Sequence, residues 1–339
     1  MVQLRYLEDF YNTSSWDKWV NSSKIIKSFY KSMFTGEAAI SGMPMSLSIE
    51  PTTSCNLRCP QCISGLRDFT RPTGMLSETM FINVINALGK YLWYINFYFQ
   101  GEPFLHEQFT DMVRYATSRH IYVSTSTNAH YLSPEVCSKI VKSGLHKLII
   151  SIDGLTQDTY EKYRVGGKLD KVQDGIKNII GAKKKYKSQS PLISLQYIVF
   201  KYNIHEISQV RNTLHLLGAD EVLIKTAQVY HSHEPDEWIP QSDKYSRYKV
   251  SDTGNYTIKN KIEDRCWKMW HSAVVTWDGR VVPCCFDKDA KYEMGNITNT
   301  PFEKIWYGNE YNNFRKKLIT SRKDIDICTN CSEGSKIWV

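Results

Sequence analysis

Strand-like and helical segments alternate along the middle of the chain, and this alternation restricts the possible folds more than any other feature. Alternation of this kind predicts a parallel sheet with crossover helices. Six strand–helix units are fewer than the eight of a closed barrel, so we expect an α/β fold with an open, partial (βα)6 TIM-like barrel. The strand-like runs are 46–50, 93–99, 121–125, 147–152, 192–200 and 221–225, and the helical patterns are 77–90, 107–119, 134–143, 168–186 and 204–217.

Local signals mark the ends of several of these helices. Ser77 and Ser133 stand at N-cap positions, although neither has the Glu or Gln three residues later that would complete a capping box. Gly144 and Gly218 follow helical patterns, where a left-handed C-cap residue is expected.

Composition describes an ordinary soluble globular protein of 339 residues, 42% hydrophobic and 23% charged. The formal net charge of +8 is spread over the chain, and its one local run, 183–187, favours a solvated helix face over nucleic-acid binding. No apolar stretch approaches the ~18 residues of a membrane span, and the first residues do not resemble a signal peptide. We therefore expect a cytoplasmic protein whose nine cysteines serve metal binding in a reducing compartment.

Three cysteines follow the first strand directly, in the pattern Cys55-x3-Cys59-x2-Cys62. A closed structural zinc or iron–sulfur site uses four protein ligands, whereas three thiolates leave one position open. Bound to four irons, this loop would leave one iron free for a small molecule.

Polar residues also stand at the ends of the next three strands. Gly101 and Glu102 end the second, the segment 124–128 ends the third, and Ser151 and Asp153 end the fourth. Each of these segments, taken alone, is more often a turn or a helix cap than part of a binding site. Because the carboxyl ends of parallel strands meet at one rim, together they indicate a binding site beside the cysteine loop. Glu102 could hold an ammonium group, and the hydroxyl and amide groups of Ser124 and Asn128 suit a ribose.

The cysteine loop after a strand, followed by Gly101-Glu102-Pro103 at the second strand, resembles the radical S-adenosylmethionine (radical SAM) superfamily. The resemblance covers roughly residues 46–225, and Gln100 replaces the first of the family's two glycines. It implies a [4Fe–4S] cluster held by the three cysteines, with SAM chelating the fourth iron. It also implies that the segment around Gly101 and Glu102 holds the SAM amino group, that Ser124 to Asn128 lie near the ribose, and that Ser151 and Asp153 belong to the same site.

Such a cluster passes one electron to SAM, which then yields methionine and a 5′-deoxyadenosyl radical that abstracts hydrogen from carbon. The cofactors carry the difficult chemistry, and the protein supplies orientation and exclusion of solvent. The resemblance also implies an electron donor such as flavodoxin or ferredoxin.

A second cysteine group lies near the C-terminus: Cys266, Cys284, Cys328 and Cys331. The run 274–283 predicts a β-hairpin with a type I′ turn at Asp278-Gly279, which would deliver Cys284. The pattern is similar to the SPASM/twitch extensions of radical SAM enzymes, and since no cysteine follows Cys331 we expect one auxiliary [4Fe–4S] cluster. A zinc-ribbon site is the alternative. Cys285 could replace Cys284 as a ligand, and Cys137 is expected to be a buried core thiol.

We expect four regions: a helical extension (1–45), the radical SAM core (46–230), a linker (231–260) and a SPASM/twitch-like auxiliary cluster domain (261–339). The segment 225–238, which leaves the last strand and leads into the linker, is a candidate for substrate contact, or an ordinary polar loop; it includes Lys225, Tyr230, His231 and His233.

A complete four-cysteine site leaves no iron for substrate, so electron transfer is the expected role of the auxiliary cluster. An electron taken from a substrate radical makes the net reaction an oxidation. The extension shows no strand–strand–helix pattern for peptide recognition, so the expected substrate is a small molecule, possibly sugar-type. The alternatives are a peptide-modifying maturase that forms a crosslink or an oxidation, and a zinc-stabilised binding protein without enzymatic activity.

Overall fold

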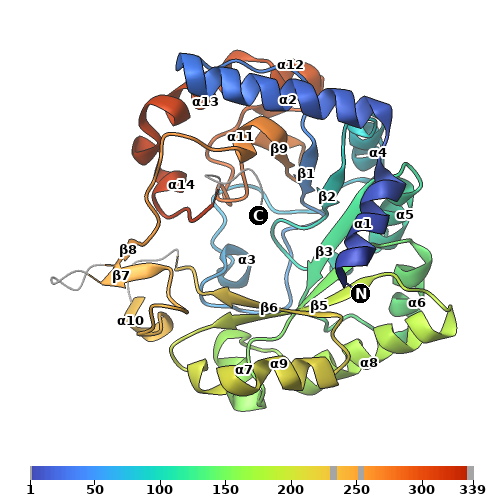
Figure 1. Cartoon of the computed structure of the whole chain (residues 1–339). Helices are drawn as coiled ribbons and strands as arrows, with labels where there is room; N and C mark the ends of the chain where they lie inside the picture. Colours follow the sequence, from blue (N-terminus) through green and yellow to red (C-terminus); the bar gives the residue numbers. More distant parts are fainter. Residues whose placement is uncertain (1, 230–234, 251–255, 334–339) are drawn as a thin grey trace.

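The computed structural model describes residues 2–229, 235–250 and 256–333. Six parallel strands, adjacent in chain order, curve around a central space (Figure 1). The first and sixth strands do not pair with each other, so the barrel is open and the expected partial α/β barrel is confirmed. The six strands are β1 (Ser46–Ile49), β2 (Tyr94–Asn96), β3 (Tyr122–Thr127), β4 (Lys147–Ser151), β5 (Leu192–Val199) and β6 (Glu221–Thr226).

Crossover helices cover the outer face of this sheet (Figure 1). Ser77 and Ser133 accept hydrogen bonds from the backbone N–H groups three residues later, and Gly144 and Gly218 have φ of 74° and 100°. The predicted caps are therefore confirmed. The crossover elements are α3 (Ile63–Leu66), α4 (Glu78–Leu88), η1 (Pro103–Leu105), α5 (Phe109–Thr117), α6 (Pro134–Lys142), α7 (Gln157–Tyr163), α8 (Leu169–Lys185), η2 (Ile204–Glu206) and α9 (Ile207–Leu216).

The predicted C-terminal hairpin is present and extends the barrel sheet. Its strands are β9 (Ser272–Val275) and β10 (Arg280–Val282), followed by β11 (Gly295–Asn296). β9 pairs in parallel with β1, so that Ser46 lies opposite Ser272, and β10 pairs antiparallel with β9. The strand that leads to Cys55 and the hairpin that leads to Cys284 are thus neighbours in one sheet.

The turn of this hairpin differs from the prediction. Thr276 N–H donates to the Arg280 carbonyl at 2.9 Å, and Gly279 N–H donates to the Thr276 carbonyl at 3.0 Å. Gly279 has φ of 85°, whereas Asp278 is not in the positive-φ region that a type I′ turn requires at both central residues. The loop therefore has three residues and ends on a left-handed glycine. Asp278 prefers this turn because its carboxylate accepts a hydrogen bond from Thr276 Oγ1 at 2.6 Å.

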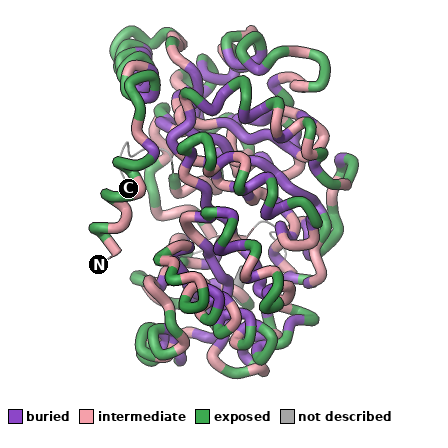
Figure 2. The backbone as a smooth tube through the Cα atoms, turned by 90° about the vertical axis from the view of Figure 1, so that its right-hand side faces the viewer, coloured by how far each residue is buried: buried purple, intermediate pink, exposed green. Residues whose placement is uncertain are grey.

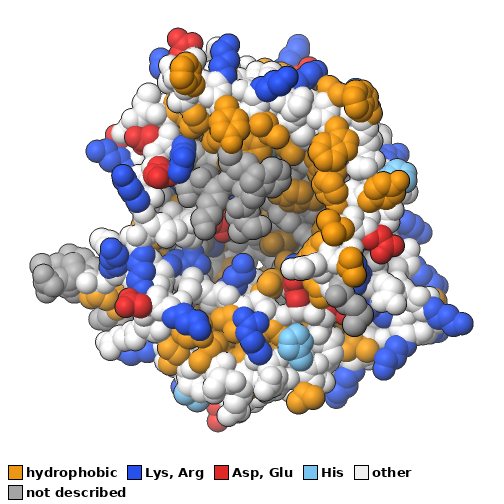
Figure 3. Space-filling view, in the orientation of Figure 1, with side chains coloured by type: hydrophobic (Ala, Val, Ile, Leu, Met, Phe, Trp, Pro, Cys, Tyr) orange, Lys and Arg blue, Asp and Glu red, His pale blue; other side chains and the backbone are white. Residues whose placement is uncertain are grey.

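Residues 2–35 form two helices, α1 (Val2–Thr13) and α2 (Trp16–Thr35), as expected. Figure 3 shows hydrophobic side chains along the sides of the central hollow nearest these helices. α2 packs against α11 (Lys268–His271), and one continuous hydrophobic core joins α2, the barrel and the C-terminal segment. The remaining elements are α10 (Pro235–Trp238), β7 (Tyr248–Val250), β8 (Tyr256–Ile258), α12 (Phe302–Trp306), α13 (Asn309–Ser321), η3 (Arg322–Asp324) and α14 (Asp326–Thr329).

Burial follows this arrangement, with the strands inside and the outward helix faces exposed (Figure 2). A buried ion pair joins β1 to the loop after α3. Arg71 donates from both terminal nitrogens to the Glu50 carboxylate, at 2.9 and 2.6 Å, and both side chains are almost fully buried. Glu50 also accepts from the Trp277 backbone N–H in the hairpin loop at 3.2 Å. Among the described residues, no helix has the length and apolar character needed to cross a bilayer.

Candidate radical SAM and auxiliary cluster sites

The first three cysteines line a cavity of about 150 Å³ at the carboxyl ends of the barrel strands. All three thiols are free of disulfide bonds. Burial raises the pKa of the Cys55 thiol to about 11 and that of Cys59 to about 12. Thiolates at these positions therefore need a positive partner such as bound iron. The cavity is also lined by Tyr98, Gly101, Glu102, Ser126, Asn128, Ser151 and Arg164.

The end of β2 is tied directly to the cysteine loop. Gly101 N–H donates to Ser64 Oγ at 2.9 Å, and Glu102 N–H donates to the Ser54 carbonyl at 2.7 Å. Gly101 has φ of 73°, and a Cβ atom there would lie 2.3 Å from the Thr52 carbonyl oxygen. Only glycine fits this approach.

Gly101→Ala should therefore disrupt the cysteine loop. The clash is with backbone and the φ is unfavourable for alanine, so we expect a loss of about 2–4 kcal/mol in the free energy of unfolding and poor iron incorporation. Urea denaturation and iron analysis measure the two effects. Gly181→Ala on α8 is the matched control, since a Cβ there meets nothing within 4 Å, and it should be neutral or stabilising by up to about 1 kcal/mol. Full iron loading of the Gly101 variant would contradict this account.

The Glu102 carboxylate is fully buried and organises the neighbouring strand end. It accepts hydrogen bonds from Thr127 Oγ1 at 2.7 Å, the Asn128 N–H at 2.8 Å and the Phe104 N–H at 3.3 Å. Burial nevertheless raises the pKa of Glu102. A cationic group entering the cavity would stabilise its ionised form.

Arg164 is a functional candidate that the sequence reasoning missed. Its Nε and Nη2 bond the Asp153 carboxylate, both at 2.6 Å, and its Nη1 lies 3.9 Å from Cys59 Sγ. Asp153 Oδ1 in turn accepts from the Ile198 N–H at 2.7 Å. The guanidinium is thus fixed beside a cysteine of the loop. Arg164 sits just after α7, with no strand end or spacing pattern to mark it.

The predicted SAM-binding residues fall into three places. Gly101, Glu102, Asn128 and Ser151 line the cysteine cavity, and Asn128 Nδ2 lies 3.9 Å from Cys55 Sγ. Asp153 is not among the lining residues, but its carboxylate binds Arg164, which does line the cavity. Ser124 lies one layer deeper in the barrel, where its Oγ donates to Asn96 Oδ1 at 2.8 Å. The linker residues Tyr230, His231 and His233 lie outside the described residues.

The four C-terminal cysteines line a second, smaller cavity of about 20 Å³. Phe286 N–H donates to Cys284 Sγ at 3.4 Å and Glu333 N–H to Cys331 Sγ at 3.3 Å. Backbone donors to sulfur are a means by which proteins tune iron–sulfur clusters. The buried Arg322 guanidinium adds positive charge on the same wall. The donor set fits a cluster with four thiolate ligands.

A zinc ribbon would need these thiols to converge on one ion with tetrahedral geometry. Over the residues that the structure describes, no group of three or more His, Cys, Asp or Glu side chains could hold a single metal ion. The four cysteines nevertheless line one shared cavity. Cys285 is not among the lining residues of this cavity, whereas Cys284 is. Cys137 is fully buried in the core, as predicted.

Comparison with known protein families distinguishes an iron–sulfur protein from a zinc-stabilised one. Residues 49–214 match the model of the radical SAM superfamily, and residues 266–332 match that of an iron–sulfur cluster-binding domain, SPASM. The chain belongs to the radical SAM superfamily. This radical SAM protein is therefore an enzyme that uses a [4Fe–4S] cluster and S-adenosylmethionine, together with auxiliary iron–sulfur chemistry in its SPASM domain.

Two curated relatives match nearly the whole of this radical SAM protein. The cofactor-modifying protein of the tungsten-containing aldehyde ferredoxin oxidoreductase from Pyrococcus furiosus is 26% identical over 84% of this chain and 86% of its own. The S-adenosyl-L-methionine-dependent 2-deoxy-scyllo-inosamine dehydrogenase of Niallia circulans is 23% identical, over 85% and 93%. The crystal structure of BtrN with AdoMet and 2-DOIA has a TM-score of 0.55 and 19% identity, covering 87% of this chain and 95% of that one, and shares the fold.

Proposed function

We propose that this radical SAM enzyme oxidises a small molecule by hydrogen abstraction, with its auxiliary cluster receiving the electron. The observation that carries the proposal is the contrast between the two cysteine sites. The first site has three thiols beside polar strand ends, which would leave one iron of a cluster without a protein ligand. The second has four thiols, which would ligate every iron of a cluster. The names of the two relatives, one modifying a cofactor and one a dehydrogenase, support a small-molecule substrate and an oxidation.

Cys55, Cys59 and Cys62 would hold the cluster that binds SAM, and Cys266, Cys284, Cys328 and Cys331 would hold one auxiliary cluster. When bound, these groups supply a 5′-deoxyadenosyl radical that takes one hydrogen atom from the substrate, and an acceptor for the electron that leaves with the second proton. The net change in the substrate is a two-electron oxidation.

The protein's own side chains position the reactants. Glu102, Asn128 and Ser151 present acceptor and donor groups to the cavity, where they would orient the amino and ribose groups of SAM. Arg164, held by Asp153, would place a positive charge beside the Cys59 thiolate and any nearby carboxylate. Bound reactants would fill this cavity and displace its water, so a reactive radical would meet the substrate first.

Cys328→Ala tests the auxiliary site. We expect the iron content to fall by about half, from about eight to about four irons per chain, while 5′-deoxyadenosine formation without substrate largely persists. Iron analysis and chromatography of the nucleoside measure both. Loss of 5′-deoxyadenosine formation together with nearly all of the iron, in a variant that stays soluble, would contradict an independent auxiliary cluster. Complete loss of soluble protein would instead indicate that the metal stabilises the fold.

The remaining partners follow from this chemistry. A one-electron reductant such as flavodoxin or ferredoxin would supply the first cluster. We also propose a cytoplasmic location, because all nine cysteines are free thiols and thiols persist in a reducing compartment.

The substrate class can be tested without knowing the substrate. Anaerobic, reduced enzyme with SAM is mixed with a host-cell extract passed through a 1-kDa filter, and 5′-deoxyadenosine is measured over time. We expect acceleration that survives treatment of the extract with protease. Acceleration confined to the fraction above the filter and lost after protease treatment would favour a peptide-modifying maturase instead.

A further inference from the structure

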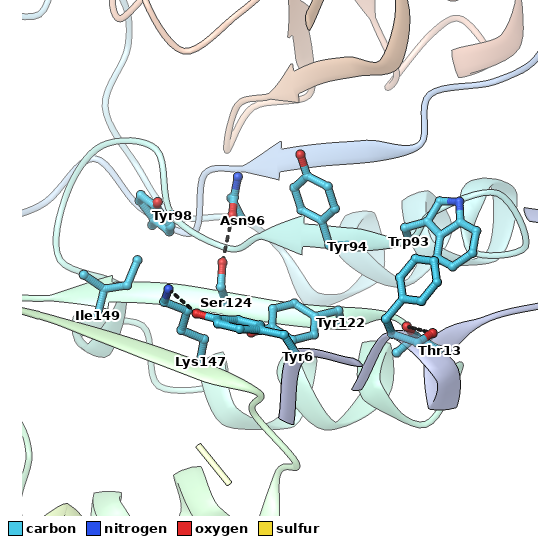
Figure 4. Close-up of a pocket in the computed structure, with 11 residues that line it drawn as sticks. Tyr6, Thr13, Trp93, Tyr94, Asn96, Tyr98, Tyr122, Ser124, Lys147 and Ile149 are labelled. Carbon is cyan, nitrogen blue, oxygen red and sulfur yellow. Dashed lines mark hydrogen bonds between the residues drawn. The ribbon is translucent and has the colours of Figure 1, made fainter. Parts of the chain in front are cut away.

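A larger cavity, of about 380 Å³, lies inside the barrel at the opposite end from the cysteine loop. It is lined by the first residues of β2, β3 and β4, and is closed on one side by α1 (Figure 4). Most of its wall is aromatic. The rings belong to Tyr6, Phe10, Trp93, Tyr94, Tyr98 and Tyr122.

This cavity and the cysteine cavity follow one another along the strands. Ser124 lines the lower cavity and Ser126 the upper one, both on β3, and Ile149 and Ser151 are related in the same way on β4. Residues two apart in a strand point to the same face and are separated by roughly 6–7 Å along it. Tyr98 lines both cavities. A molecule in the lower cavity therefore lies next to the SAM site.

Several polar groups of the lower cavity already have partners. Asn96 and Ser124 bond each other at 2.8 Å (Figure 4). Lys147 donates to Tyr6 Oη at 2.8 Å and pairs with Glu221 at the start of β6. These contacts occupy the Asn96 amide oxygen, the Ser124 hydroxyl, the Lys147 ammonium group and the Tyr6 hydroxyl.

Tyr122 differs from these groups. Its hydroxyl is buried and has no hydrogen-bond partner among the described residues. The same hydroxyl lies near the charged groups of α1 and Glu221, and burial raises its pKa, so it remains a neutral donor. A buried donor without an acceptor is unfavourable, and a bound ligand that offers an oxygen would satisfy it.

We propose that this aromatic cavity is the substrate site of the enzyme and that the substrate carries a planar ring system with an oxygen acceptor such as a carboxylate or carbonyl. The proposal rests on the function proposed above and narrows its substrate class. The rings offer stacking and edge-to-face contacts to a flat group, and the Tyr122 hydroxyl offers a donor to its oxygen. A polyhydroxylated sugar would lose more hydrogen bonds to water on entering this mostly aromatic cavity than a flat ring with one oxygen-bearing group.

The test uses the full-length, cluster-loaded protein with excess SAM, so that the upper cavity is filled. Isothermal titration calorimetry compares 2-naphthoate with scyllo-inositol as probes. We expect naphthoate to bind at least about tenfold more tightly. Tyr122→Phe, which removes only the hydroxyl, should weaken naphthoate binding about fivefold, and Tyr94→Leu about tenfold. Tyr11→Leu is the control, because Tyr11 lies on α1 but is 79% exposed, and it should bind as the wild type does.

Equal or tighter binding of inositol would overturn the proposal, as would wild-type naphthoate affinity in both Tyr94→Leu and Tyr122→Phe. 5′-Deoxyadenosine formation is measured on the same wild-type preparation. If naphthoate binds but no 5′-deoxyadenosine forms, the proposed function alone is refuted. If 5′-deoxyadenosine forms normally but naphthoate does not bind, only the aromatic substrate site is refuted.

Discussion

Replacing Cys55, Cys59 and Cys62 together with alanine is expected to abolish 5′-deoxyadenosine formation while about four irons per chain remain. Within the described part of the chain, these three thiols are the only cysteines that line the cavity with the polar strand ends, and the remaining iron would belong to the four-thiol site. Anaerobic reconstitution, iron analysis and chromatography of the nucleoside give the two readouts. Nucleoside production at wild-type rates in the triple variant would exclude this loop as the site of SAM cleavage.

Cys137→Ala provides the matched control for this experiment. Cys137 is fully buried on α6, away from both cysteine cavities. The substitution removes one sulfur atom from the core and should cost about 1 kcal/mol. Iron content and nucleoside formation should therefore match those of the wild type, which separates the effect of losing ligands from the general effect of losing thiols.

Glu50→Gln is expected to lower the free energy of unfolding by about 3–5 kcal/mol. The substitution keeps the size of the side chain but leaves the buried Arg71 guanidinium without a counter-charge, and breaking a buried ion pair from one side has a cost of this order. Because Glu50 also accepts from the Trp277 N–H, the contact between β1 and the hairpin loop should loosen as well. Urea denaturation followed by circular dichroism measures the change.

Two further variants separate charge from packing. Glu50→Leu combined with Arg71→Met should recover most of the lost stability, because apolar residues of similar size can replace a buried ion pair. Glu135→Gln removes the partner of Lys139 in a pair that is 78% and 59% exposed, and it should change stability by less than about 0.5 kcal/mol. A Glu50→Gln variant as stable as Glu135→Gln would show that the buried pair contributes little.

Much of the barrel could be predicted because its signals are local. Apolar runs between polar turns marked all six strands, and the caps at Ser77, Ser133, Gly144 and Gly218 formed as their residue types require. The thiol spacing in the loop after β1 indicated an open cluster site for a similar reason: its three ligands are close in sequence. The predicted type I′ turn of the hairpin was wrong. Asp278 accepts a hydrogen bond from the Thr276 hydroxyl in a three-residue loop, and the Asp-Gly pair alone does not reveal this contact.

The parts that could not be predicted depend on contacts between distant segments. Arg164 reaches Cys59 from a helix end with no distinctive pattern. The aromatic cavity brings Tyr6 of α1 to Lys147 of β4, and no periodicity relates these residues. The pairing of β9 with β1 likewise joins strands from opposite ends of the chain. Such features follow from how the elements assemble and leave no trace in a single segment.

The pairing of β9 with β1 also governs how the chain can be made. During synthesis, β1 and β2 emerge long before β9, so one side of β1 has unpaired backbone groups until nearly the whole chain has left the ribosome. Exposed strand edges of this kind promote aggregation, and contacts between distant segments form slowly. We expect the barrel to depend on its C-terminal hairpin for solubility, so that a fragment ending after β6 accumulates in inclusion bodies. The C-terminal segment that carries β9 and the four-thiol site would then complete the folding of the barrel as well as bind iron.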